Sequence, residues 1–90
     1  MKEIIVKIEP FVLKQKVFIK EDGKEGMTVK EMSQKNLINF LEFSACDCDC
    51  MKVHLFGSEK LTSKIKEECL CNNLFAKNNV DIIINGKVER

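Results

Sequence analysis

The chain has 90 residues, 44% of them hydrophobic and 32% charged, and its 15 basic and 14 acidic residues leave a net charge of +1. This length favours one domain over residues 1–90, and the near-neutral charge argues against nucleic acid or a membrane surface as the partner. No signal-peptide pattern follows Met1, so we expect a cytoplasmic protein whose cysteines stay reduced.

The first part of the chain predicts three antiparallel strands. Residues 3–9 and 15–21 both show the period-two alternation of strands that have one buried side. The Asp22-Gly23 dipeptide between the second and third strands supplies the positive φ of a tight hairpin. A weaker third strand is predicted over residues 27–30, which completes an antiparallel meander.

The second part of the chain predicts two helices that alternate with two strands. Ser33 is typical of a helix N-cap, and the apolar spacing that follows it predicts a helix ending near Cys46. A short apolar strand is predicted over 51–56, and Ser58 is placed to cap a second helix. A last strand over 80–85 ends at an Asn-Gly dipeptide.

The predicted element order is β-β-β-α-β-α-β, which defines an α+β fold class. Because crossovers between parallel strands are right-handed, a five-stranded mixed sheet with the first strand central places both helices on one face. This order resembles the ribonuclease-H-like fold, which actin-type ATPases share in outline. A ferredoxin-like arrangement is the alternative, and it requires the first hairpin to be absent.

The strand patterns predict two different sheet faces. The face under the helices collects apolar side chains: Ile4, Val6, Ile8, Val17, Ile19, Val53, Leu55, Val80, Ile82 and Ile84. The opposite face mixes apolar and polar ones: Ile5, Lys7, Phe18, Lys20, His54, Phe56, Asp81 and Ile83. With two helices in the chain, no predicted element is left to cover this second face.

Four positions on the second face form a predicted apolar strip: Ile5, Phe18, Phe56 and Ile83. A contiguous apolar strip on a surface is typical of an interface, and a domain this small gains from additional burial. We therefore expect a protein partner, with a homodimer as one form of it. In the alternative, the aliphatic stems of Lys7, Lys16 and Lys20 cover the strip and the protein is a monomer.

The resemblance in fold does not bring a recognisable catalytic site. Nucleases of that fold hold magnesium with carboxylates on the first strand, the first helix and the fourth strand. Here the middle of the first strand reads Ile5-Val6-Lys7, and the first helix has Glu42 alone. Gly57 is an isolated glycine, whereas actin-type ATPases have glycine-rich phosphate loops. We therefore expect a protein without catalysis and without a cofactor.

His54 is the one histidine of the sequence. Cysteine-histidine catalysis would need a thiolate beside it and a third group to orient the ring. Because its predicted strand turns this side chain away from both helices, we expect His54 to be structural or solvated.

All five cysteines lie between Cys46 and Cys71. Four of them form the alternative prediction, a thiolate zinc site or a redox sensor: Cys46, Cys48, Cys50 and Cys71. The cysteines form two runs, residues 46–50 and residues 69–71. Each run falls where a predicted helix ends and a strand begins, and the predicted topology puts both places at one end of the sheet. Their one-residue spacing is unlike that of common zinc motifs. The fifth, Cys69, falls on the apolar stripe of the second helix and is expected in the core.

The stretch Val53-His54-Leu55-Phe56-Gly57-Ser58, with the Lys/Glu-rich helix and closing strand after it, resembles small phage and mobile-element proteins of low-GC Gram-positive bacteria. That resemblance covers most of the chain and implies no assigned activity. The sequence therefore predicts a small cytoplasmic protein that acts through protein contacts, with metal or redox binding as the alternative.

Overall fold

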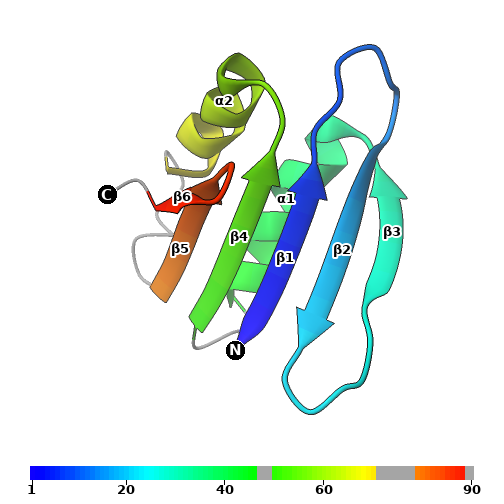
Figure 1. The fold of residues 1–90 in the computed structure, drawn as a ribbon, viewed down its shortest axis with the longest axis vertical. Helices are drawn as coiled ribbons and strands as arrows, with labels where there is room; N and C mark the ends of the chain where they lie inside the picture. Colours follow the sequence, from blue (N-terminus) through cyan, green and yellow to red (C-terminus); the bar gives the residue numbers. More distant parts are fainter. Residues whose placement is uncertain (47–49, 71–78, 89–90) are drawn as a thin grey trace.

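A mixed β-sheet forms one layer of the molecule and two helices form the other (Figure 1). The computed structural model describes residues 1–46, 50–70 and 79–88. The strands are β1 (Lys2–Lys7), β2 (Gln15–Glu21), β3 (Thr28–Met32), β4 (Cys50–Phe56), β5 (Asn79–Ile84) and β6 (Lys87–Val88). The helices are α1 (Gln34–Cys46) and α2 (Glu59–Leu70).

The strand order is β3-β2-β1-β4-β5-β6, so the predicted fold class and the central position of β1 are confirmed. β1 pairs antiparallel with β2 and parallel with β4, and β5 pairs parallel with β4. The β1–β2 hairpin that a ferredoxin-like fold would lack is present. The parallel strands β1, β4 and β5 therefore end at the same edge of the sheet, where the connection from β4 to α2 begins.

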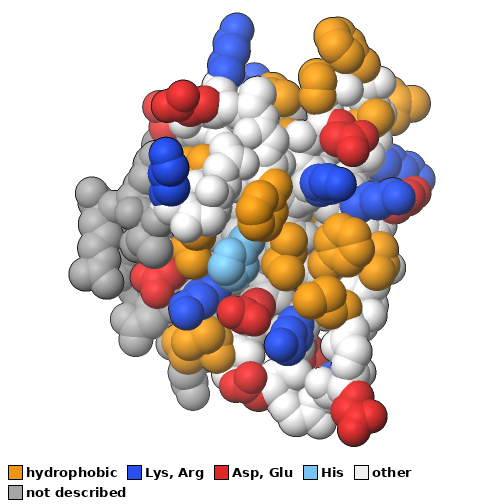
Figure 2. All heavy atoms as spheres, viewed as in Figure 1, with side chains coloured by type: hydrophobic (Ala, Val, Ile, Leu, Met, Phe, Trp, Pro, Cys, Tyr) orange, Lys and Arg blue, Asp and Glu red, His pale blue; other side chains and the backbone are white. Residues whose placement is uncertain are grey.

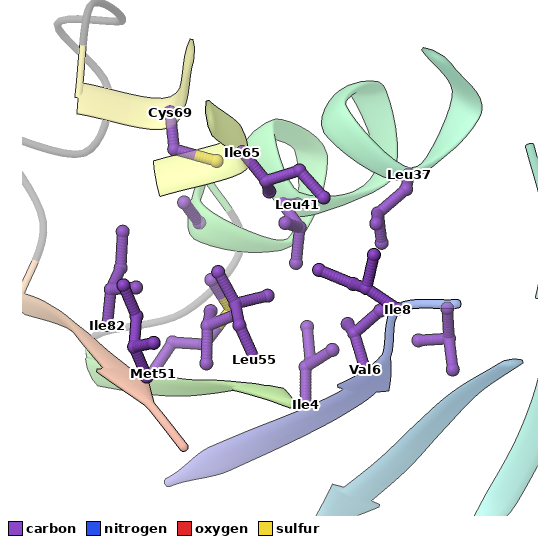
Figure 3. Close-up of a cluster of buried hydrophobic side chains, with 14 of the residues drawn as sticks. Ile4, Val6, Ile8, Leu37, Leu41, Met51, Leu55, Ile65, Cys69 and Ile82 are labelled. Atoms are coloured by element: carbon purple, nitrogen blue, oxygen red, sulfur yellow. The ribbon is translucent and has the colours of Figure 1, made fainter. Parts of the chain in front are cut away.

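The hydrophobic core lies between the helices and one face of the sheet, as the alternation predicts. Nine of the ten predicted positions on this face belong to the buried cluster, and the tenth, Val80, is partly buried against it. Leu37 and Leu41 of α1, together with Ile65 of α2, point at the sheet in Figure 3. Both helices therefore cover the same face.

Local signals position both helix starts. The Ser33 hydroxyl accepts a hydrogen bond from the Asn36 amide at 3.3 Å, and the Ser58 hydroxyl accepts one from the Leu61 amide at 3.3 Å. Each bond satisfies an amide that has no partner within its helix, which confirms the two predicted N-caps. Neither helix in the described part of the chain is long and apolar enough to cross a membrane.

The structure adds a strand that the sequence patterns did not predict. Asn85 and Gly86 have φ values of 50° and 79°, and Ile84 pairs with Lys87 across them. Two consecutive residues with positive φ form the tight turn that Asn-Gly favours, so the dipeptide turns the chain back as β6.

The predicted tight hairpin at Asp22-Gly23 is a longer connection. Gly23 has the expected positive φ of 81°, and the Lys24 amide donates to the carbonyl of Glu21. Pairing between β2 and β3 nevertheless stops at Ile19 and Thr28, so residues 20–27 lie outside the ladder of these two strands.

Candidate interaction face

The sheet surface that points away from both helices is called the open face here, and Figure 2 views it directly. Hydrophobic side chains gather over the middle strands, around the pale-blue histidine, and charged side chains surround them. The strand register sorts these side chains into three rows that run across the sheet.

The middle row, called the apolar row, joins five strands through direct cross-strand partners: Val29, Phe18, Ile5, His54 and Ile83. Val29 is 55% exposed, whereas Ile5 and Phe18 are half-buried. Ile83 is 8% exposed but lies outside the core cluster, because it points to the other face of β5 from Ile82 and Ile84. Strands β4 and β6 flank it. The row is thus a continuous apolar stripe with one polar ring in it.

Phe56 extends the apolar surface toward the ends of the parallel strands. Its side chain is 38% exposed, and its ring stacks on that of His54 with centroids 6.5 Å apart and planes within 7°. The four residues predicted for the interface, Ile5, Phe18, Phe56 and Ile83, therefore all lie on the open face.

The second row, called the charged row, alternates in sign. Glu3 on β1 has Lys20 of β2 on one side and Lys52 of β4 on the other, and Lys52 faces Asp81 of β5. Opposite charges on neighbouring strands are favourable cross-strand pairs. The order across the sheet is therefore Lys20, Glu3, Lys52, Asp81.

The third row, called the lysine row, lies on the other side of the apolar row. Lys7 of β1 faces Lys16 of β2 and Phe56 of β4, and Lys16 faces Glu31 of β3. Like charges directly opposite each other on neighbouring strands repel. A partner that offers acidic or aromatic groups to these lysines would relieve the repulsion.

His54 has a definite environment on the open face. Its Nε2 atom lies 3.8 Å from an Oε1 atom of Glu3, and the ring stacks on Phe56. Of the described thiols, Cys69 lies in the core on the other side of the sheet, Cys46 lies at the end of α1, and Cys50 lies four residues before His54 on β4. The ring therefore acts as a polar member of the apolar row.

The structure places two of the four predicted metal ligands. Cys46 is exposed at the end of α1, and Cys50 is half-buried at the start of β4. Cys48 and Cys71 lie outside the described residues. Within the described ranges, no three His, Cys, Asp or Glu side chains are close enough to share a metal ion. Zinc binding by the cysteines stays a prediction.

Cys69 occupies the core position predicted for it. Its side chain is 1% exposed. Burial, and secondarily the negative charges of Glu42 and Glu68, raises the pKa of the Cys69 thiol to about 12. Both causes act in one direction, because an apolar surrounding and nearby carboxylates disfavour the thiolate.

Cys69 is therefore expected to resist alkylation in the folded protein. At about pH 8 its thiol is neutral, and we expect iodoacetamide to label it at least roughly 100-fold more slowly than exposed Cys46. Peptide mass spectrometry after timed labelling measures both rates, and labelling of the chain in urea provides the control. Equal rates in the folded protein would contradict the buried placement of Cys69.

The loop between β1 and β2 is a second apolar surface, which the sequence patterns did not single out. Phe11 is fully exposed, and Leu13 is 92% exposed. The base of the loop is closed by the Gln15 side chain, which accepts from the Glu9 amide at 2.8 Å and donates to the Glu9 carbonyl at 3.1 Å. Three consecutive apolar residues after a proline were the available signal.

Comparison with protein-family models, with curated proteins and with solved structures finds no match for this chain.

Proposed function

We propose that the protein is a non-catalytic, cytoplasmic binding module that acts by protein contact through its open face, with a second copy of the chain as its partner. One observation carries the proposal: an apolar row crosses the sheet on the face that the described helices leave bare. The parts of these side chains that are still exposed, largest at Val29, stay in water until another surface covers them. Burial of exposed apolar surface is the main driving force of association.

The pattern of charge on the open face supports a protein partner over other ligands. Lysines and acidic residues occur together around the apolar row, so the face has no uniform sign that would favour nucleic acid or an anionic membrane. An apolar centre with a polar rim is instead the usual composition of a protein interface.

The experiment that tests this proposal compares the wild-type protein with Phe18→Glu. We expect light scattering, in reducing buffer with chelator, to show a dimer whose dissociation constant rises on the order of 100-fold in the variant, because the interface loses an aromatic contact and gains a buried charge. Glutamate at this position stands between Lys16 and Lys20 on β2, so the monomer should keep its fold. Circular dichroism of the variant verifies this.

Phe11→Glu is the matched control, because it removes an equally large and more exposed aromatic ring that lies off the open face. We expect it to leave the dimer unchanged. A wild-type protein that is monomeric at all accessible concentrations would overturn the proposal. A dimer lost in Phe11→Glu but kept in Phe18→Glu would also overturn it and would assign the contact to the β1–β2 loop.

A further inference from the structure

The three rows on the open face also constrain how two copies can meet. The constraint comes from a general property of two-fold symmetric dimers, in which each surface patch meets the same patch of the other copy. Like charges that the symmetry brings together repel, and a buried like-charge contact costs far more than an exposed one. Candidate axes can therefore be compared by the residues that each one places opposite each other.

We propose that two copies pack open face to open face about a two-fold axis that runs parallel to the strands and passes between β1 and β4. This proposal rests on the self-association proposed above and specifies its geometry. The axis lays β1 of one copy over β4 of its partner and β2 over β5. Aligned packing of this kind is one of the two common ways in which sheets stack.

This axis places every residue of the charged row opposite a residue of the other sign. Glu3 falls opposite the partner's Lys52, and Lys20 falls opposite the partner's Asp81, each pair occurring twice by symmetry. The charges alternate in sign across four strands, so reversing the order of the strands in the second copy places an opposite charge against each of them. Each residue of the charged row therefore keeps its opposite charge on the neighbouring strand and gains another one across the interface.

The same axis suits the other two rows. Phe18 falls opposite the partner's Ile83, and Ile5 falls opposite the partner's His54, so four of the five residues of the apolar row cover one another. In the lysine row, Lys7 falls opposite the partner's Phe56, whose ring can receive the ammonium group on its face.

Neighbouring axes are less favourable. An axis over β1 opposes Glu3 to the partner's Glu3, and an axis over β4 opposes Lys52 to the partner's Lys52. An axis between β1 and β2 brings Lys7 onto the partner's Lys16. An axis between β4 and β5 puts β2 beyond the partner's last strand, which leaves Phe18 uncovered.

An axis perpendicular to the strands remains for comparison. It reverses the strand direction and lays the charged row over the lysine row, so that Lys20 meets the partner's Lys16. Of the axes considered, the one between β1 and β4 alone both covers Phe18 and brings no like charges of the three rows into contact.

The test uses two charge-reversed chains, Glu3→Lys and Lys52→Glu. Each chain alone would place two pairs of like charges at the axis, and we expect each to raise the dissociation constant on the order of 100-fold. A mixture of the two chains restores both pairs of opposite charge. In one half of the mixed interface the two introduced side chains meet each other, and in the other half the unchanged Lys52 of the first chain meets the unchanged Glu3 of the second. Native mass spectrometry should therefore show the mixed dimer in large excess over either homodimer.

A second charge-reversed pair, Glu21→Lys and Lys24→Glu, controls for net charge alone. These two residues form an ion pair of 2.7 Å beside the β2–β3 connection, away from the open face. Their variants should dimerise like the wild type, both singly and in mixture. Circular dichroism of all four variants establishes that each is folded.

The outcomes separate the geometry from the proposed function. A wild-type dimer that Phe18→Glu dissociates, together with no gain on mixing, overturns the axis and leaves self-association standing. Tighter dimers of Lys52→Glu alone indicate the axis over β1, where residue 52 meets the partner's Lys20, and also overturn the proposal. A monomeric wild type overturns both the axis and the self-association.

Discussion

Replacing Gly57 by alanine is expected to lower the free energy of unfolding by about 3 kcal/mol or more, from backbone strain and steric overlap together. Gly57 has a φ of 150°, which residues with a Cβ atom rarely adopt. An added Cβ would also lie 2.6 Å from the backbone oxygen of Ile8 and 3.2 Å from its Cβ. Neither atom belongs to the free end of a side chain, so β1 and β4 would have to separate.

The surroundings of Gly57 make that separation costly. The Ile8 amide donates to the carbonyl of Phe56 at 2.7 Å, and the side chain of Asn85 bonds both the amide and the carbonyl of Gly57, at 3.1 and 3.0 Å. These bonds tie together the ends of β1, β4 and β5. A shift at Gly57 would therefore weaken contacts to all three strands.

Gly23→Ala is the matched control for this prediction. Gly23 also has a positive φ, of 81°, but an added Cβ would meet no atom within 4 Å. Its alanine variant should lose about 1 kcal/mol from backbone strain alone. Urea denaturation of both variants at one protein concentration measures the difference, since the proposed dimerisation would make the midpoint depend on concentration. Equal losses would show that the overlap with Ile8 does not matter.

The sequence predicted the two sheet faces well because alternation alone decides them. In a strand, a shift of one residue would move every apolar side chain to the other face, so Ile4 and Val6 indicate the buried side without knowledge of neighbouring strands. The same alternation placed Ile5 and Phe18 on the opposite face. Four members of the apolar row were therefore predicted on the correct face, whereas Val29 was assigned to neither face: the four are Phe18, Ile5, His54 and Ile83.

The charge pattern on that face was not predictable in the same way. That Glu3 lies between Lys20 and Lys52 depends on the register of two different pairings, one to β2 and one to β4. No periodicity within a single strand contains this information. The contacts of Asn85 with Gly57 likewise join residues 28 positions apart, although the Asn-Gly dipeptide itself was a recognisable turn signal.

The other large effect on stability is expected in the core, where side chains are buried, and not on the open face. Replacing Leu41 by alanine should lower the free energy of unfolding by about 3–4 kcal/mol, because its side chain is fully buried between α1 and the sheet and its loss leaves a cavity. For a chain of this length that corresponds to a fall of roughly 12 °C or more in Tm.

Phe43→Ala is the matched control on the same helix. Phe43 is 76% exposed, so its removal should change the free energy of unfolding by about 0.5 kcal/mol or less. Both substitutions are best measured in the Phe18→Glu chain, since this variant is expected to weaken the proposed dimer and so to reduce any contribution of dimerisation to the thermal midpoint. Leu41→Ala should then unfold at a much lower temperature than its parent, and Phe43→Ala close to it. Equal midpoints for the two variants would contradict the assignment of the core to the helix-covered face and, with it, the separation between the residues that hold the fold and those left free to bind.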